Sequence, residues 1–470
     1  MRSVDPRKFK PDTDDSNAKG LDTRLAPTRS LVLCPVLQKR NGAAARAGAS
    51  VKPLSRTPQA QLEEAIGLAR AIGLEICSSG IVQIAKPRPG TLLGTGKVEE
   101  LRGIIAAEDI DLVIVDHPLT PVQQRNLEKA WSVKVLDRTG LILEIFGDRA
   151  QTREGRLQVE LAHLTYQKSR LVRSWTHLER QRGGVGFLGG PGETQIESDR
   201  RALQGKITRL RRELEQVKRT RSLHRKSRKR VPYVIIALVG YTNAGKSTLF
   251  NHVTGADVAA EDQLFATLDP TMREIQLPGG AKAILSDTVG FISNLPTGLI
   301  AAFRATLEEV LEADLILHVR DIASEESGAQ ARDVENVLGE LGIEASESQE
   351  RIMQVWNKMD LLDEERASEI RHAAKRTDGG ALCVSAITGE GVPALLSGIE
   401  ARLNASDREV EITLDPGEGA LVNWLHENTQ ILSSDTDGQG RTTFHLRISH
   451  AREQQFTKRF ANRPSASAAE

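Results

Sequence analysis

The sequence predicts a multidomain α/β protein built around a mostly parallel, doubly wound sheet. A small α/β domain with an antiparallel two-helix arm precedes this sheet, and a small α+β unit follows it. Three observations lead to this prediction. Apolar strand-like runs alternate with helical patterns in two separate stretches. Two heptad-spaced runs flank a glycine-rich segment. The chain of 470 residues is too long for a single core.

Composition argues against several protein classes. Hydrophobic residues make up 39% of the chain and charged residues 27%, and no stretch approaches the roughly 18 consecutive apolar residues of a membrane helix. Residues 1–55 are expected to form a disordered leader and a first strand region, without the apolar core of a signal peptide. The three cysteines are widely spaced, which favours reduced thiols over zinc or disulfides. We therefore expect a cytoplasmic protein without a membrane span.

Residues 56–150 are expected to form the N-terminal α/β domain. Helical periodicity appears in "QAQLEEAIGLARAIGL", and strand-like runs follow in "DLVIVDHP" and "VKVLD". Helices that alternate with strands indicate a small sheet with helices packed on it.

Residues 151–230 are expected to form the arm. Apolar residues recur at heptad-like steps from Leu157 to Leu178 and again from Ile196 to Val217. Between them lies "GGVGFLGGPGE", whose glycines cannot sustain a helix. Two helices of about 25 residues each, joined by this loop, predict an antiparallel hairpin with a projecting tip.

The second arm helix carries a strong positive charge. The whole chain has 63 basic and 63 acidic residues, yet residues 199–230 contain 14 basic and 3 acidic ones, an excess of 11. Such a block favours RNA phosphate as a partner, although an acidic protein surface or a plain basic linker would also fit. The candidate RNA-binding residues in this block are Arg219, Arg221, Arg225, Lys226, Arg228, Lys229 and Arg230.

Residues 231–404 contain a phosphate loop. An apolar strand is followed by Gly240-x4-Gly245-Lys246-Ser247 and a helix start. In such loops backbone N–H groups surround the phosphates, the lysine neutralises the β and γ oxygens, and the serine hydroxyl ligates Mg²⁺. This strand–loop–helix context predicts a nucleoside triphosphate site at the end of a doubly wound sheet.

Two later segments match the nucleotide switches of GTPases. In "QLFATLDPT" we expect Thr267 to meet Mg²⁺ and the γ-phosphate, with Thr271 as the second candidate. In "AILSDTVG" we expect Asp287 to reach Mg²⁺ through water and the Gly290 amide to bond the γ-phosphate.

Guanine selectivity is predicted from "NKMD". The Asp360 carboxylate can accept two hydrogen bonds from guanine, Asn357 can bond the purine edge and tether the phosphate loop, and Lys358 can cover the ring. In "LCVSAIT" Ser385 would shape a turn and the Ala386 amide would face guanine O6. The full set of expected nucleotide-binding residues is Gly240, Tyr241, Thr242, Asn243, Ala244, Gly245, Lys246, Ser247, Thr248, Phe265, Ala266, Thr267, Leu268, Asp269, Asp287, Thr288, Val289, Gly290, Asn357, Lys358, Met359, Asp360, Ser385, Ala386 and Ile387.

The expected catalytic groups are Lys246, Thr267 and Gly290. Phe291 stands where other GTPases place a water-orienting glutamine, so intrinsic hydrolysis should be slow and need help. One source of help is K⁺ held by Asn243, which resembles the asparagine of potassium-activated GTPases; the alternative is an asparagine that only caps the loop. Equal turnover in KCl and NaCl would exclude the cation. The other source is a partner that orders the switches.

Together these segments resemble the HflX family of bacterial ribosome-associated GTPases. The resemblance rests on "LLGTGKVEEL", the arm sequence, "GYTNAGKSTLFN", "DQLFATLDPT", "DTVGFISNLP" and "NKMD", and covers roughly residues 60–400. It implies binding of GTP and GDP, and GTP hydrolysis stimulated by the ribosome. It also implies association with the large ribosomal subunit and its rRNA, and splitting or rescue of stalled or idle ribosomes. A phenylalanine after the DxxG turn is normal in that family.

By the same analogy, the arm's tip would enter the large subunit near the peptidyl-transferase region. Gly184, Phe187 and Gly190 would then contact rRNA, with Phe187 stacking on a base or instead clasping the arm. We expect a monomer whose only membrane association is peripheral, through ribosomes. The competing interpretation is an RNA-binding assembly or regulatory factor that senses guanine nucleotide with little turnover. Phosphate release measured with and without ribosomes separates the two.

Residues 405–470 are expected to form the C-terminal unit and tail. "REVEITLD" and "RTTFHLRIS" have strand patterns, and "GALVNWLHEN" between them has a helical one. The sequence predicts no role for this unit.

Overall fold

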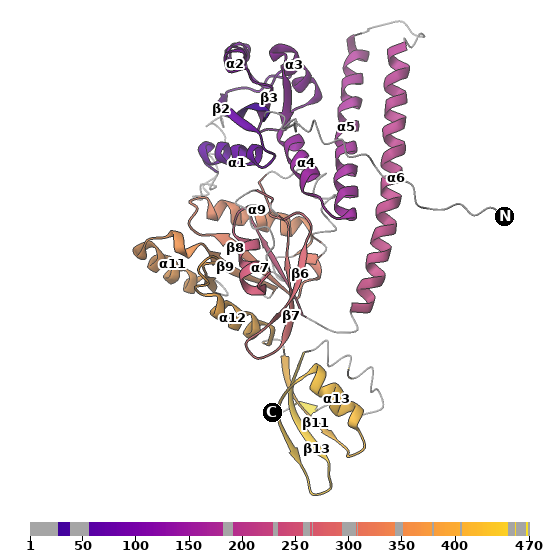
Figure 1. The fold of residues 1–470 in the computed structure, drawn as a ribbon, viewed down its shortest axis with the longest axis vertical. Helices are drawn as coiled ribbons and strands as arrows, with labels where there is room; N and C mark the ends of the chain where they lie inside the picture. Colours follow the sequence, from indigo (N-terminus) through magenta and orange to yellow (C-terminus); the bar gives the residue numbers. More distant parts are fainter. Residues whose placement is uncertain are drawn as a thin grey trace, which may run out of the picture.

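The structure is a computed structural model. It describes residues 27–37, 56–181, 191–228, 234–256, 264–265, 267–293, 307, 309–343, 351–377, 380–404, 407–449, 456 and 467–468. Figure 1 shows four groups of elements, which we name the N-terminal domain, the arm, the central domain and the C-terminal unit. The fold class predicted from the sequence is confirmed.

The N-terminal domain is a parallel sheet in the order β2-β1-β3-β4 with helices on both faces. The predicted first helix stops at Arg70, short of Leu74, because Gly73 turns the chain with a φ of 69°. β2 has no continuous apolar run, so its pattern gave no strand signal. The elements are β1 (Arg29–Leu37), α1 (Pro58–Arg70), β2 (Glu75–Ile84), α2 (Thr95–Ala107), β3 (Leu112–Val115), α3 (Pro121–Trp131), β4 (Lys134–Asp137) and α4 (Arg138–Arg149).

The arm consists of α5 (Arg153–Gln181) and α6 (Pro191–Arg228), which are 29 and 38 residues long. Both exceed the expected length, and α6 begins inside the predicted loop because proline is favoured in a first helical turn. The heptad seam is present: Leu157 packs on Leu210 and Leu214. Figure 1 shows α6 as the longest helix in the view, and 38 residues correspond to about 57 Å.

The base of the arm is fixed to the N-terminal domain. The Tyr166 hydroxyl on α5 donates to Asp137 Oδ1 at 2.6 Å, and the Arg170 guanidinium donates to Asp137 Oδ2 at 2.6 Å. Asp137 is 1% exposed and also accepts from the backbone amide of Gly140, so it caps α4 at the same time. The arm and α4 therefore share one buried carboxylate.

The central domain is a six-stranded sheet in the order β10-β9-β8-β5-β7-β6. All strand pairs are parallel except β6 with β7. Its elements are β5 (Val234–Gly240), α7 (Lys246–Thr254), β6 (Thr271–Gln276), β7 (Lys282–Asp287), β8 (Leu315–Asp321), α9 (Ser327–Glu340), β9 (Ile352–Asn357), the 3-10 turn η2 (Met359–Leu361), α11 (Glu364–Arg376), β10 (Ala381–Cys383) and α12 (Val392–Asn404).

The C-terminal unit is an antiparallel sheet in the order β12-β13-β11-β14, with one helix packed on it through Trp424 and Leu425. Its elements are β11 (Asp407–Leu414), α13 (Gly419–Asn428), β12 (Gln430–Thr436), β13 (Thr442–Ser449) and β14 (Ser467–Ala468). Among the helices of the described ranges, none combines the length and apolarity needed to cross a bilayer.

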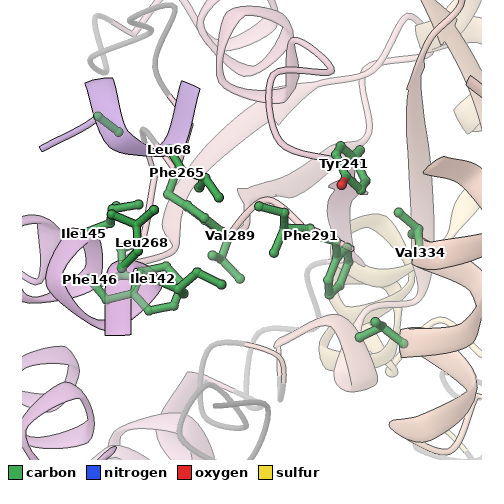
Figure 2. Packing of buried hydrophobic residues seen from close by; sticks show 14 of the residues in the cluster. Leu68, Ile142, Ile145, Phe146, Tyr241, Phe265, Leu268, Val289, Phe291 and Val334 are labelled. Atoms are coloured by element: carbon green, nitrogen blue, oxygen red, sulfur yellow. The ribbon is translucent and has the colours of Figure 1, made fainter. Parts of the chain in front are cut away.

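The N-terminal and central domains share one hydrophobic core. Figure 2 shows α4 residues Ile142 and Phe146 beside Phe265 and Leu268 of the central domain, with Phe291 on the other side of Val289, toward Val334. The Phe146 and Phe265 rings meet edge-on with centroids 4.7 Å apart. The two domains are therefore joined by core packing and not by a flexible contact.

A buried charge network lies at the edge of this shared core. Glu64 on α1 pairs with Arg56 and with Arg138, each at 2.6 Å, and the three side chains are at most 10% exposed. Glu64 also accepts hydrogen bonds from the hydroxyls of Tyr241 and Ser293 in the central domain. Burial acts to raise the pKa of Glu64, but the two arginines hold it below its usual value. Glu64 therefore stays ionised between the domains.

Replacing Glu64 should destabilise the joined domains. In Glu64→Ala, Arg56 and Arg138 lose a buried counter-charge. The free energy of the first unfolding transition in urea should therefore fall by about 3 kcal/mol, and its midpoint should move to a lower urea concentration. Glu63→Ala, at the exposed neighbouring position on α1, is the matched control. Equal midpoints for the two variants would contradict a stabilising role for the network.

The central sheet also buries a histidine. His318 on β8 is 1% exposed, its Nδ1 lies 3.2 Å from Gln354 Nε2, and its Nε2 has no hydrogen-bond partner within the described residues. Burial, with the nearby charges of Arg320 and Lys246, lowers its pKa to about 3. The folded chain therefore keeps this imidazole neutral at pH values where an unfolded chain protonates it.

This difference predicts acid sensitivity. Above the ordinary histidine pKa of about 6.5 both states are neutral, and below it only the unfolded state gains the proton, so the free energy of unfolding should fall by up to about 1.4 kcal/mol per pH unit. In His318→Gln this part of the slope between pH 6.5 and 5 should disappear in urea titrations. His372→Gln, at an exposed position on α11, is the control. An unchanged slope in His318→Gln would refute the assignment.

Candidate functional site

The phosphate loop connects β5 to α7. Gly245 adopts a φ of 88°, and a Cβ there would lie 2.3 Å from the Asn357 side-chain nitrogen, so only glycine fits. The Lys246 ammonium donates to the Tyr241 carbonyl at 2.9 Å. Burial lowers the pKa of Lys246 to about 8, against the opposing effect of Asp287. An anion bound beside Lys246 would stabilise its charged form.

Three oxygen-bearing side chains meet at the start of α7. Ser247 Oγ lies 2.8 Å from Thr267 Oγ1 and donates to Asp287 Oδ2 at 2.7 Å, and Thr267 donates to the same oxygen at 2.9 Å. Thr267 belongs to this group. Thr271, the second candidate, is instead the first residue of β6. Burial raises the pKa of Asp287, while Lys246 and the two hydroxyls act against the rise.

This cluster fits a hard cation. Asp287 is 0% exposed, and its Oδ1 atom has no hydrogen-bond partner among the described residues. Hydroxyl and carboxylate oxygens are the ligands that Mg²⁺ prefers in proteins. Within the described ranges no group of three or more His, Cys, Asp or Glu side chains could hold a metal, so a cation here would depend on this mixed set.

The DxxG turn closes over the phosphate loop. A Cβ at Gly290 would lie 2.8 Å from Thr242 Cγ2 and 3.2 Å from Lys246 Nζ, so glycine is needed for the approach. Backbone bonds link the two segments: Thr242 N donates to Phe291 O at 2.8 Å, and Phe291 N donates to Gly240 O at 3.0 Å. Gly290 therefore lies close to the lysine that would meet a terminal phosphate.

The base-recognition segments converge on the same edge of the sheet. Asn357 Nδ2 donates to Ala244 O at 2.9 Å, which is the expected tether to the phosphate loop. Asp360 accepts from Ser385 Oγ at 2.6 Å, and Lys358 pairs with Asp321 at 2.9 Å. The Ala386 amide, expected to be directed at a purine oxygen, donates to Asn357 Oδ1 at 2.9 Å. Ile387 is 73% exposed beside this group.

Several side chains of the predicted site face the N-terminal domain. Phe265, Leu268, Val289 and Phe291 are each at most 5% exposed and belong to the shared core, as Figure 2 shows. Asp269 accepts hydrogen bonds from the first residues of the arm. Phe291 is thus a buried member of the cluster that the two domains share.

Some predicted residues lie outside what the structure describes. Ala266 is one of them, as are the tip residues Gly184, Phe187 and Gly190 and the basic residues Lys229 and Arg230. Arg219 has an exposed side chain 3.9 Å from Glu215. Asn243 is exposed with a φ of 59°, a geometry that suits a capping asparagine and leaves the side chain accessible. For Arg221, Arg225, Lys226 and Arg228 only the helical backbone is described.

No local pattern predicted the residues that attach the N-terminal domain to this site. Glu64 and Arg138 contact Tyr241 and Ser293 across separations of 177 and 155 residues. Such pairs have no fixed spacing, so periodicity could not reveal them.

Family models match nearly the whole chain. Residues 59–147 match a GTP-binding GTPase N-terminal region, residues 149–228 a GTP-binding GTPase middle region, residues 235–358 a family described as 50S ribosome-binding GTPase, and residues 369–470 the HflX C-terminal domain. The four matches follow the order of the structural groups.

Full-length relatives agree with these matches. The chain is 47% identical over 431 residues to the GTPase HflX of Magnetococcus marinus, covering 92% of this chain and 95% of that protein. It is 42% identical over 387 residues to the GTPase HflX of Escherichia coli, covering 82% and 89%. A solved complex of SsGBP with GDP is 23% identical with a TM-score of 0.45, covering 79% of this chain and 97% of that one. The chain belongs to the HflX family of GTPases.

Proposed function

We propose that this GTPase binds the large ribosomal subunit in its GTP state and splits or rescues stalled or idle ribosomes, with hydrolysis stimulated by the ribosome. The observation that carries the proposal is the packing of both switch segments against the domain that bears the arm. Any rearrangement of the switches therefore changes contacts of the N-terminal domain. The description of the matching central family as 50S ribosome-binding supports the choice of partner.

The arrangement of the site supports the nucleotide contacts that we propose. Lys246 neutralises the β and γ phosphates, and the Gly290 amide donates to the γ-phosphate. Ser247 and Thr267 would ligate Mg²⁺ and Asp287 would help to hold it, and the ion would supply charge neutralisation when bound. The same ordering of Thr267 and Gly290 would be lost after hydrolysis, which would release both switches.

The buried phenylalanine explains why help is needed. Phe291 is 2% exposed within the shared core, so this position supplies no group that orients water. The helper we propose is the ribosome, which would order the switches of the docked protein. A monovalent cation at the exposed Asn243 is a second proposed helper, tested by comparing turnover in KCl and NaCl. The protein would act in the cytoplasm as a monomer.

Guanine selection by Asp360 can be tested with a base swap. In Asp360→Asn the carboxylate no longer accepts from guanine N1 and N2, so GTP affinity should fall on the order of 10² or more. Xanthine carries an oxygen where guanine has the amino group, so XTP should bind the variant better than the wild type. Calorimetry with both nucleotides measures this, and Glu364→Gln, in the exposed first turn of α11, is the control. Unchanged GTP affinity would refute the assignment.

The arm's charge can be tested by cosedimentation with purified large subunits. The wild type should sediment better with a non-hydrolysable GTP analogue than with GDP. Replacing Arg221, Arg225, Lys226 and Arg228 by glutamine should weaken binding and flatten its salt dependence, because fewer phosphate counterions are released. The matched control replaces four basic residues of α11, namely Arg366, Arg371, Lys375 and Arg376.

Two outcomes would contradict the ribosome proposal. The first is equal loss of binding in the arm and α11 variants, which would show only non-specific charge. The second is phosphate release that large subunits and whole ribosomes do not stimulate, which would favour the alternative of a guanine nucleotide sensor with little turnover.

A further inference from the structure

The first switch is attached directly to the arm. Asp269 Oδ2 accepts from the backbone amides of Gln151 at 2.9 Å and Thr152 at 2.7 Å, and its Oδ1 accepts from the Thr152 hydroxyl at 2.6 Å. Thr152 immediately precedes α5, and its hydroxyl in turn accepts from the Gly155 amide at 3.0 Å. A carboxylate is favoured at this end of a helix, where unpaired N–H groups gather.

The first turn of α5 has room for this carboxylate and for little else. A Cβ at Gly155 would lie 2.6 Å from Asp269 Oδ1 and 3.4 Å from its carboxyl carbon. Gly155 does not have a positive φ, so the backbone does not require glycine there. A side chain at position 155 would press most closely on Asp269, and next on the Thr152 hydroxyl at 3.1 Å.

Three consecutive residues of the switch are held by three different parts of the molecule. Thr267 meets Ser247 and Asp287 in the nucleotide site. Leu268 is 3% exposed in the shared core. Asp269 meets the arm. Because adjacent residues are about 3.8 Å apart, a shift of Asp269 must be taken up within one residue of Leu268 or transmitted to Thr267.

We infer that Asp269 is a positioning residue for GTP hydrolysis: held by the first turn of α5, it keeps Thr267 at the cation site. The inference rests on the proposed role of Thr267 and extends it, because it makes the base of the arm part of the machinery that orders the first switch. The coupling is reciprocal, so an arm displaced by its partner would alter the hold on Thr267.

The test is the Mg²⁺ concentration that gives half-maximal single-turnover GTP hydrolysis by the full chain. Asp269→Ala removes three hydrogen bonds, and the net loss of one of them corresponds to about a fivefold increase in that concentration if the loss reaches Thr267. Asp269→Asn retains an acceptor for the two amides and should shift it less. GDP affinity, which does not depend on a γ-phosphate contact, should stay at the wild-type value in both variants.

Gly155→Ala separates positioning from simple stabilisation. A purely structural role for this contact predicts that Gly155→Ala changes the stability of the protein and leaves the kinetics unchanged. Displacement of Asp269 by the new Cβ instead predicts a higher Mg²⁺ requirement, as in Asp269→Ala. Asp148→Ala, an exposed carboxylate near the end of α4, is the matched control.

Thr267→Ala distinguishes the two levels of the proposal. If it leaves the Mg²⁺ requirement unchanged, the assigned role of Thr267 is wrong and the inference falls with it. If Thr267→Ala raises the requirement while Asp269→Ala and Gly155→Ala stay within about twofold of the wild type, the positioning role of Asp269 alone is overturned. Raised requirements in all three, with GDP binding intact, support it.

Discussion

The structure depends on one constraint: the switch segments of the GTPase domain are core residues of the interface with the N-terminal domain. Phe265, Leu268, Val289 and Phe291 supply part of a single cluster with α1 and α4. Burying such side chains is worth roughly 1.5–3 kcal/mol each, so neither domain can expose them without a large cost. The nucleotide-sensing parts therefore cannot change shape independently of the N-terminal domain.

This constraint explains why an apolar side chain suits position 291. A glutamine in that position would bring an amide into an apolar core without partners, at a cost of about 1–3 kcal/mol. The phenylalanine instead adds apolar packing to the cluster that the two domains share. Hydrogen bonds add to this apolar interface at two places. Glu64 is bonded to Tyr241 at the phosphate loop, and Asp269 is bonded to Thr152 at the start of the arm.

Much of the fold and of the site follows from local patterns. The phosphate loop, Asp287, Gly290, Asn357 and Asp360 come after strands, and parallel strands bring such ends to one edge. The heptad steps also predicted the pairing of α5 with α6. The sequence could not predict which residues the switch side chains contact. Asp269 was expected at the nucleotide, whereas its carboxylate meets the arm. No periodicity relates position 269 to position 152, since that contact exists only after both domains fold.

The most direct test of the account is backbone hydrogen exchange of the full chain bound to GDP and to a non-hydrolysable GTP analogue. Exchange in α1 and α4, which pack on the switches, should differ between the two states, whereas α2 and α3, which belong to the separate core on the other face of the N-terminal sheet, should exchange alike. Identical exchange in α1 and α4 in both states would contradict the claim that the nucleotide is sensed across the shared core.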